Sequence, residues 1–357
     1  MPCFHPLQEY FPINKATGEL GRAKFCHIGS ARDNAAWAES KGFPFYLVPC
    51  GQCAGCRSDY AREWTDRLVL ENAAAKEGNS WFVTLTYNDE SLPRAYTVDR
   101  ETGVEGVLGV IRQSDISVWI KRIRDRLDVK GGRFYAVSEY GSISRRPHFH
   151  CLLFNFPIPD RRSYVQTDGD DVFLPRGTFF SETLQAAWHD DNGQSLGYVS
   201  FKRAEIWSIG YCAGYATKKL RGLHNKEYLQ LCDELGVTPQ PPERATMSNR
   251  PGIGVPYIAG KDPRDLWRTG RIAVPDTKNG AHLRELPRVF ERPCIEDASD
   301  LIDAAKARRL EGAKSAAFSA LLASGLKNNE SLLTMKEIDY LSKKRKKLRE
   351  PLAPKPR

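Results

Sequence analysis

The spacing of apolar positions predicts a series of helices and strands along the chain. After Ser114, which can cap a helix, apolar residues recur at i, i+3, i+4, i+7 and i+11, the period of a helix with one buried face. The β-branched and aromatic run at 81–87 predicts a buried strand. Further helices are expected at 56–75, 181–189, 207–220, 226–235 and across much of 298–348, and a further strand at 197–206.

Two more apolar runs, 133–140 and 148–154, are separated by a polar loop that is too short for a crossover connection. They are therefore expected to form an antiparallel hairpin. Segments 88–112 and 157–180 contain Pro and Gly without an apolar period, so we expect both to be inserted loops.

The composition is that of a protein with a sizeable core. Of 357 residues, 41% are hydrophobic and 27% are charged, which excludes the fibrous and wholly disordered classes. No apolar run approaches the roughly 18 residues of a membrane span. The first residues lack the basic and apolar regions of a signal peptide, so a cytoplasmic location is expected.

The net charge of +9 is concentrated near the carboxyl end. Residues 343–357 hold eight basic residues against Glu350 alone, together with three prolines. The densest run consists of Lys343, Lys344, Arg345, Lys346 and Lys347. Such a segment is expected to be a disordered tail that binds polyanions, above all nucleic acid, and a solubilising tail is the alternative.

Three of the nine cysteines, Cys50, Cys53 and Cys56, have the spacing C-x-x-C-x-x-C with glycines between them. Glycine permits the tight backbone that brings several thiolates onto one ion. Structural zinc needs a fourth ligand, and the amino-terminal candidates are Cys3, Cys26, His5 and His27, of which Cys3 is preferred as a thiolate. An iron–sulfur cluster, or three unrelated thiols, are the alternatives.

His148 and His150 alternate along the second hairpin strand and must therefore point to the same face. Glu139 on the partner strand can supply a third ligand if the register sets it opposite one of them, which the sequence leaves open. Two imidazoles and a carboxylate suit Mg²⁺ or Mn²⁺ acting on phosphate, and also admit zinc. The alternative is a pair of packed or surface histidines.

Tyr211 and Tyr215 are one turn apart on a predicted helix, and Lys218 and Lys219 follow. Tyrosines at this spacing often only pack in a core. Beside a two-histidine metal site, however, a phenol becomes a credible nucleophile toward phosphorus, because a neighbouring cation favours phenolate.

The three motifs, in the order Phe-Val-Thr-Leu-Thr-Tyr at 82–87, His-Phe-His at 148–150 and Tyr-x-x-x-Tyr at 211–215, resemble those of the HUH endonucleases. Within that superfamily the chain is most similar to replication initiation proteins of small single-stranded DNA phages of the microvirus group, in particular the gokushovirus branch. That branch also has an amino-terminal Met-Pro-Cys, a run like that at 50–56 and an M-S-x-x-P-G-I-G run like that at 247–254. The resemblance covers about residues 1–260.

The resemblance implies an α+β fold with a central antiparallel sheet flanked by helices. It also implies rolling-circle initiation, in which Tyr211 or Tyr215 attacks an origin phosphate, leaving a 5′-phosphotyrosyl protein and a 3′-OH that a host polymerase extends. His148, His150 and Glu139 would hold Mg²⁺ or Mn²⁺, and Lys218 or Lys219 would stabilise the phenolate. The chain departs from the pattern in which a lysine lies between the tyrosines, because Gly214 stands there. Single-stranded and supercoiled origin DNA, a host helicase and a host polymerase are the partners expected.

Four regions are expected: an amino-terminal segment with the cysteine cluster at 1–78, a catalytic core at 79–260, a mainly helical region at 261–342 and the basic tail at 343–357. A relaxase or single-strand transposase shares the motif kit and is the nearest alternative. A histidine-triad hydrolase would need His at 152, which is Leu. A noncatalytic zinc-dependent nucleic-acid-binding protein would leave the two tyrosines unexplained.

Overall fold

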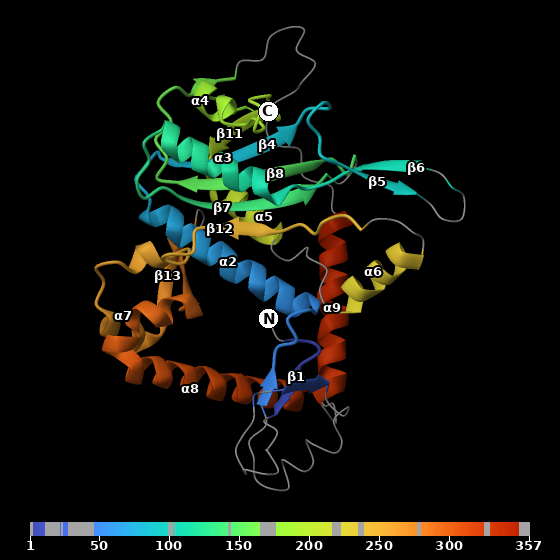
Figure 1. Cartoon of the computed structure of the whole chain (residues 1–357). Coiled ribbons are helices and arrows are strands. Elements are labelled where there is room, and N and C mark those ends of the chain that lie inside the picture. The colour runs from blue at the N-terminus through green and yellow to red at the C-terminus, as the bar shows by residue number, and fades with distance from the viewer. Residues whose placement is uncertain are drawn as a thin grey trace. The chain divides into compact units, whose positions relative to one another are not determined.

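The chain divides into two compact units, which are described separately. The computed structural model describes residues 3–10, 22, 24–27, 46–98, 103, 105–141, 144–164, 176–215, 223–234, 239–276, 280–324 and 329–349 (Figure 1). The central unit is Ala61–Ala305, and the terminal unit combines Met1–Tyr60 with Lys306–Arg357. No helix among these described residues is long and apolar enough to cross a membrane.

A seven-stranded antiparallel sheet forms the centre of the central unit, in the order β12-β7-β8-β4-β11-β10-β9. Its strands are β4 (Ser80–Tyr87), β7 (Arg133–Tyr140), β8 (Pro147–Phe154), β9 (Arg162–Ser163), β10 (Phe179–Phe180), β11 (Gly197–Arg203) and β12 (Ala245–Met247). The strands expected at 81–87, 133–140, 148–154 and 197–206 are thus confirmed to within a few residues. Together with the helices on its faces, the sheet confirms the α+β class.

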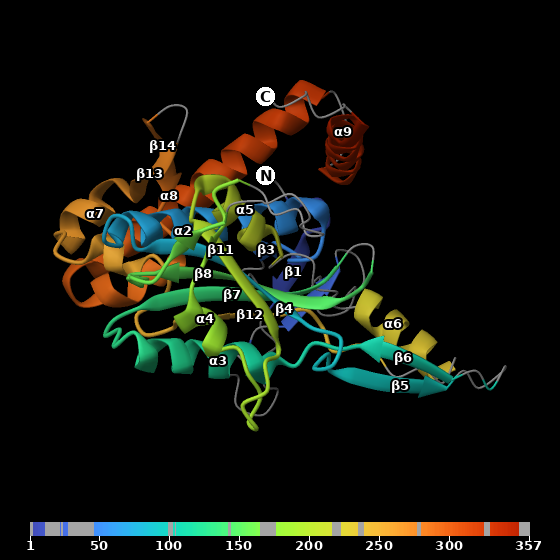
Figure 2. The ribbon, with the colours of Figure 1, turned by 90° about the horizontal axis from the view of Figure 1, so that it is seen from above.

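Helices cover both faces of this sheet, as the two views agree (Figures 1 and 2). On one face, α3 (Gln113–Arg126) buries Ile116, Trp119, Ile120 and Ile123 in a cluster with Val83, Leu85 and Phe149 of the sheet, and α4 (Glu182–Ala186) adds Leu184. On the other face, α2 (Ala54–Ala74) and α5 (Ile206–Tyr215) pack on Phe82, Tyr135 and Leu152. Burial of successive residues of the strands on opposite faces explains why these runs are apolar throughout.

Three pairs of strands lie where the sequence predicted none. Within the expected loop 157–180, the short strands β9 and β10 pair with each other. Within the expected loop 88–112, β5 (Arg94–Val98) pairs with β6 (Glu105–Gly109), and the aromatic Tyr96 lies opposite the β-branched Val107. Within the region expected to be mainly helical, β13 (Arg271–Asp276) pairs with β14 (Gly280–Glu285). The remaining elements of the central unit are α6 (Leu223–Glu234), η1 (Val255–Ile258), α7 (Pro263–Thr269), η2 (Arg288–Phe290) and the first part of α8 (Glu291–Ser324).

A buried ion pair fastens the run at 247–254 to the core of the central unit. Arg133 Nε on β7 donates to Glu71 Oε1 on α2, and the backbone N–H of Gly254 donates to the other carboxylate oxygen at 2.6 Å. Arg133 also donates to the carbonyl of Pro251 at 2.8 Å. Gly254 has φ +89°, and a Cβ there would lie 3.1 Å from the carbonyl of Arg67. The glycine-bearing run therefore has a structural role in this chain, and a larger residue at 254 would be strained.

The terminal unit contains a small sheet and a long helix. Strands β1 (Leu7–Tyr10), β2 (Lys24–His27) and β3 (Tyr46–Val48) form an antiparallel sheet in the order β2-β1-β3. Helix α9 spans Asn329–Arg349. The first seven residues of the segment expected to be disordered, 343–349, therefore lie in a helix, since Lys, Arg and Leu are good helix formers and Pro first occurs at 351.

Candidate active site and metal centre

The register of the β7–β8 hairpin brings a carboxylate and two imidazoles together. Glu139 lies opposite His148, and Val137 lies opposite His150. Glu139 Oε2 is 3.3 Å from His148 Nε2 and 3.5 Å from His150 Nε2, and the carboxylate is 5% exposed. The three ligand atoms lie within 4.8 Å of one another. Adjacent ligands of an octahedral cation at about 2.1 Å lie about 3 Å apart, so this set fits one divalent ion after a small contraction.

Both imidazole rings present Nε2 to the carboxylate because their Nδ1 atoms have partners elsewhere. His148 Nδ1 lies 3.1 Å from the carbonyl of Arg146, which can only accept, so this nitrogen carries the proton. His150 Nδ1 lies 3.1 Å from Thr84 Oγ1 on β4. Thr84 was not predicted from the sequence, although threonines at alternate positions of the otherwise apolar strand 81–87 are a signal that could have identified it.

Helix α5 places two phenols beside this set. Tyr211 donates to Glu139 Oε2 at 3.4 Å, and Tyr215 donates to the Tyr211 oxygen at 2.5 Å. The centroid of the His150 ring is 5.2 Å from that of Tyr211 and 6.2 Å from that of Tyr215. Buried residues of α5, Ile209, Cys212 and Ala213, hold the helix on the sheet while Tyr211 remains 41% exposed. The two phenols and the three potential ligands therefore lie on the same face of the sheet, with the ring of Tyr211 open to solvent.

The electrostatics of the site disfavour phenolate in the absence of a cation. Burial, followed by the interactions with Glu139, raises the pKa of Tyr215, and burial is also the main cause of the raised pKa of Tyr211. The hydrogen bond between the phenols lowers the pKa of Tyr211 and raises that of Tyr215. A bound divalent cation would offset the carboxylate charge that opposes ionisation.

The two lysines predicted to assist, Lys218 and Lys219, lie outside the described residues. Their roles stay predictions. Of the basic run, Lys343 is described, and its Nζ pairs with Asp339 Oδ2 at 2.7 Å along α9. The side chains of Lys344, Arg345, Lys346 and Lys347 lie outside the described residues, although their backbone is helical.

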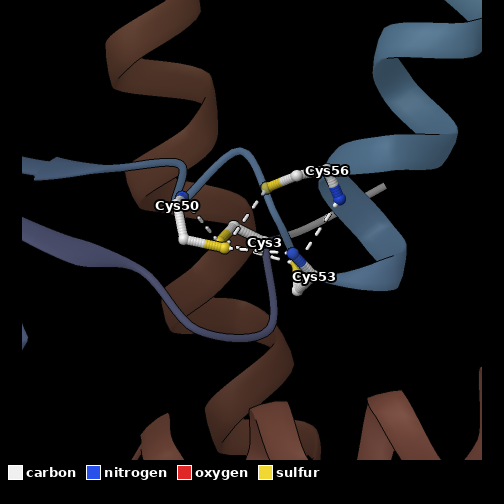
Figure 3. Close-up of side chains that lie close together, drawn as sticks. All are labelled: Cys3, Cys50, Cys53 and Cys56. Carbon is white, nitrogen blue, oxygen red and sulfur yellow. Dashed lines mark hydrogen bonds between the residues drawn. The ribbon is translucent and has the colours of Figure 1, made fainter. Parts of the chain in front are cut away.

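A second cluster gathers four thiols in the terminal unit (Figure 3). Cys3 comes from the amino-terminal stretch, and Cys50, Cys53 and Cys56 come from the loop and first turn of α2. The Sγ atoms of Cys50 and Cys56, and those of Cys53 and Cys3, are 3.9 Å apart. Tetrahedral zinc with Zn–S bonds of about 2.3 Å separates its sulfurs by about 3.8 Å, so the four thiols fit this ion.

Among the alternatives for a fourth ligand, Cys3 is the residue that the structure places in the cluster. His5 Nε2 instead pairs with Glu337 at 2.8 Å, and the side chains of Cys26 and His27 lie outside the described residues. The sequence preference for Cys3 agrees with this geometry.

Backbone amides point at the sulfurs, as expected for thiolate ligands. The N–H groups of Phe4 and Cys56 donate to Cys53 Sγ at 3.3 and 3.4 Å. Burial raises the pKa of Cys53, but the hydrogen bonds outweigh this effect and lower the pKa to about 7. Burial raises the pKa of Cys3 to about 11 and also raises that of Cys56. Cys3 and Cys56 can therefore ionise near neutral pH only with a cation among the sulfurs.

Comparison with known proteins agrees with this arrangement. The family described as "Replication-associated protein ORF2/G2P" matches residues 80–220, which run from β4 past α5 and include the histidines, Glu139 and both tyrosines. No solved structure gives a significant match.

Three phage proteins are similar over longer stretches. "Replication-associated protein ORF2" of Spiroplasma virus 4 is 29% identical over 356 residues, covering 98% of this chain and 95% of that one. "Replication-associated protein VP4" of Bdellovibrio phage phiMH2K is 31% identical, covering 62% and 59%. "Replication-associated protein ORF4" of Chlamydia phage 1 is 25% identical, covering 53% and 42%. The chain is therefore similar to the replication-associated proteins of microvirus phages, as its motifs predicted.

Proposed function

We propose that the protein initiates rolling-circle replication by nicking the viral-strand origin as an HUH endonuclease. The observation that carries the proposal is the convergence of Tyr211 and Tyr215 on the face formed by Glu139, His148 and His150. A noncatalytic nucleic-acid-binding protein would have no need of this cluster. The homologues' names support a role in replication.

The cleavage is a transesterification at phosphorus. One tyrosine oxygen bonds to the scissile phosphorus while the bond from phosphorus to O3′ breaks. The phenol proton passes to water, and the departing O3′ takes a proton from water, so charge is balanced. The products are a 5′-phosphotyrosyl protein and a free 3′-OH, which a host polymerase can extend.

The residues divide the work between them. His148, His150 and Glu139 would hold Mg²⁺ or Mn²⁺, which supplies polarisation of the scissile phosphate when it is bound. The buried faces of α5 and the sheet hold the phenols beside the three ligands, and this fixed position would lower the entropic cost of the attack. Lys218 or Lys219 would stabilise the phenolate. Gly214 stands where the resembled pattern has a lysine between the tyrosines, so the cation would have to come from a residue after Tyr215.

Two phenols on adjacent turns support a second cleavage by the same molecule. After one circuit, the free tyrosine would attack the regenerated origin phosphate. The newly released 3′-OH would then attack the first phosphotyrosyl bond, freeing that tyrosine and closing the displaced strand into a circle. The 2.5 Å contact between the two oxygens is consistent with such a handover.

The terminal unit would bind DNA. Zinc on Cys3, Cys50, Cys53 and Cys56 would hold this unit together, and the basic end of α9 with the residues after it would contact phosphates. The substrate would be single-stranded or supercoiled origin DNA. Because the protein would act together with a host helicase and polymerase, we expect it in the bacterial cytoplasm.

The test is incubation of the full chain with labelled single-stranded origin DNA and Mn²⁺ or Mg²⁺. We expect a protein–DNA adduct that survives denaturation and disappears in Tyr211→Phe/Tyr215→Phe. His148→Ala and His150→Ala should abolish the adduct and leave DNA binding largely intact. An undiminished adduct in the double tyrosine variant would refute the assignment of the nucleophiles.

A further inference from the structure

The first of the three motifs, the apolar strand at 82–87, supplies none of the proposed ligands or nucleophiles. We propose that Thr84 on this strand is a positioning residue, whose hydroxyl holds His150 in the tautomer and orientation needed to bind the cation. This inference rests on the proposed function, because it assumes that His150 is a ligand. It concerns the side chain that selects the metal-binding form of the imidazole.

The sheet register brings the two residues together. Thr84 lies directly opposite His150 in the β4–β8 pair, so both side chains point to the same face. Thr84 Oγ1 is 3.1 Å from His150 Nδ1, while Nε2 of the same ring faces Glu139 at 3.5 Å. The hydroxyl and the carboxylate therefore meet opposite edges of one imidazole.

A second residue of the same strand fixes the plane of the ring. Phe82 lies two residues before Thr84 and on the same face, and its ring stacks on that of His150 with centroids 5.2 Å apart and an interplanar angle of 15°. Phe82 also meets Tyr211 edge-on at 6.2 Å. Stacking on Phe82 fixes the plane of the imidazole. The hydrogen bond at Nδ1 then fixes the rotation of the ring within that plane and the nitrogen that carries the proton.

A hydroxyl can accept or donate, and the two arrangements have opposite consequences. If Thr84 accepts from Nδ1–H, Nε2 keeps its lone pair and can bind a cation. If Thr84 donates to Nδ1, the proton moves to Nε2, which cannot then ligate. In the metal-free protein the carboxylate of Glu139 faces Nε2 and would attract that proton. The role proposed for Thr84 therefore depends on its hydroxyl accepting from Nδ1–H.

The neighbouring strand position offers a matched control. Thr86 lies opposite His148 just as Thr84 lies opposite His150. His148, however, has the carbonyl of Arg146 as its Nδ1 partner, and a carbonyl can only accept. Removing the Thr86 hydroxyl should therefore leave the tautomer of His148 unchanged.

Mn²⁺ binding to the full chain, followed by the electron paramagnetic resonance signal of free Mn²⁺, tests the proposal. Thr84→Val keeps the branched shape without the hydroxyl and should weaken binding by about 10- to 100-fold, as for other partners of ligand histidines. Thr84→Ser should restore binding, and Thr86→Val should bind as the wild type does. Equal affinity in Thr84→Val and the wild type would overturn the proposal.

Nitrogen-15 NMR spectra of histidine-labelled, metal-free protein show which nitrogen of His150 is protonated. This property would not change if Thr84 had only a packing role. With the His150 signal assigned from His150→Gln, the wild type should show a protonated Nδ1 and an unprotonated Nε2, and Thr84→Val should lose this preference. A protonated Nε2 in the wild type would refute the role of Thr84 even if no variant folded. Absence of Mn²⁺ binding in the wild type would instead refute the metal site of the proposed function, and the spectra would still decide on Thr84.

Discussion

The buried ion pair of Glu71 and Arg133 allows the loss of unfolding free energy in Glu71→Gln to be predicted from its burial and hydrogen bonds. Glu71→Gln removes the charge but preserves the size of the side chain. Both carboxylate oxygens accept a hydrogen bond, one from Arg133 Nε and the other from the backbone N–H of Gly254. Glutamine has only one acceptor oxygen, so its NH₂ group must face a donor.

The expected cost follows from burial. Glu71 is 2% exposed and Arg133 is 8% exposed, so the substitution leaves a guanidinium without its counter-charge inside the protein. Removing one partner of a buried ion pair costs about 3–5 kcal/mol. With a urea m-value of about 3 kcal/mol/M, the midpoint of unfolding should fall by about 1–2 M.

Urea denaturation followed by tryptophan fluorescence measures this loss, because six of the seven tryptophans lie in the central unit. Glu63→Gln, at an exposed position of the same helix, is the control and should change the unfolding free energy by less than about 0.5 kcal/mol. The double variant Glu71→Leu/Arg133→Met should lose less than Glu71→Gln, since no uncompensated charge remains. Equal midpoints for Glu71→Gln and Glu63→Gln would show that the buried pair does not stabilise the fold.

Three further predictions concern the chemistry and the DNA. In a single-cleavage assay, Tyr211→Phe should slow adduct formation more than Tyr215→Phe. The hydrogen bond between the two phenols lowers the pKa of Tyr211 and raises that of Tyr215, so Tyr211 is the easier phenol to ionise. A larger loss in Tyr215→Phe would contradict this order. Elemental analysis of chain stripped of its weakly bound cation should find about one zinc per chain, lost in Cys56→Ser, whereas zinc-free wild type would leave the thiols without a role. Deleting 343–357 should flatten the dependence of log K on log salt by about 0.7 per lost phosphate contact, and an unchanged slope would mark this segment as inert.

The spacing of apolar residues was sufficient to predict most of the main strands and helices of the central unit. Apolar runs and helical spacing predicted β4, β7, β8, β11, α2 and α3 because each of these elements buries a face in its own core cluster. The hairpin β5–β6 was missed because it has little burial: Tyr96, Val98 and Val107 are exposed, so no alternation marks its strands. The Glu71–Arg133 pair was also missed, since charged side chains buried together leave no periodic signal.

The candidate site depended on facts that the sequence does not contain. The motifs identified Glu139, His148 and His150 as possible ligands, but the pairing of Glu139 with His148 is set by register, and a shift of one residue would turn the carboxylate to the other face. Thr84 escaped notice for the same reason, because its partner lies on another strand. The convergence of α5 on the hairpin is a tertiary arrangement that spacing alone does not determine.

The proposed reaction joins a phenol oxygen of α5 to a 5′-phosphate of DNA, with the help of a cation held beside it. The most direct measurement is mass spectrometry of the adduct after nuclease trimming and trypsin digestion, with fragmentation of the peptide 204–218 that contains both tyrosines. We expect a nucleotide phosphate on Tyr211 or Tyr215, formed with Mn²⁺ and absent from His150→Ala. A nucleotide on any other residue, or an adduct that forms equally well in His150→Ala, would contradict it.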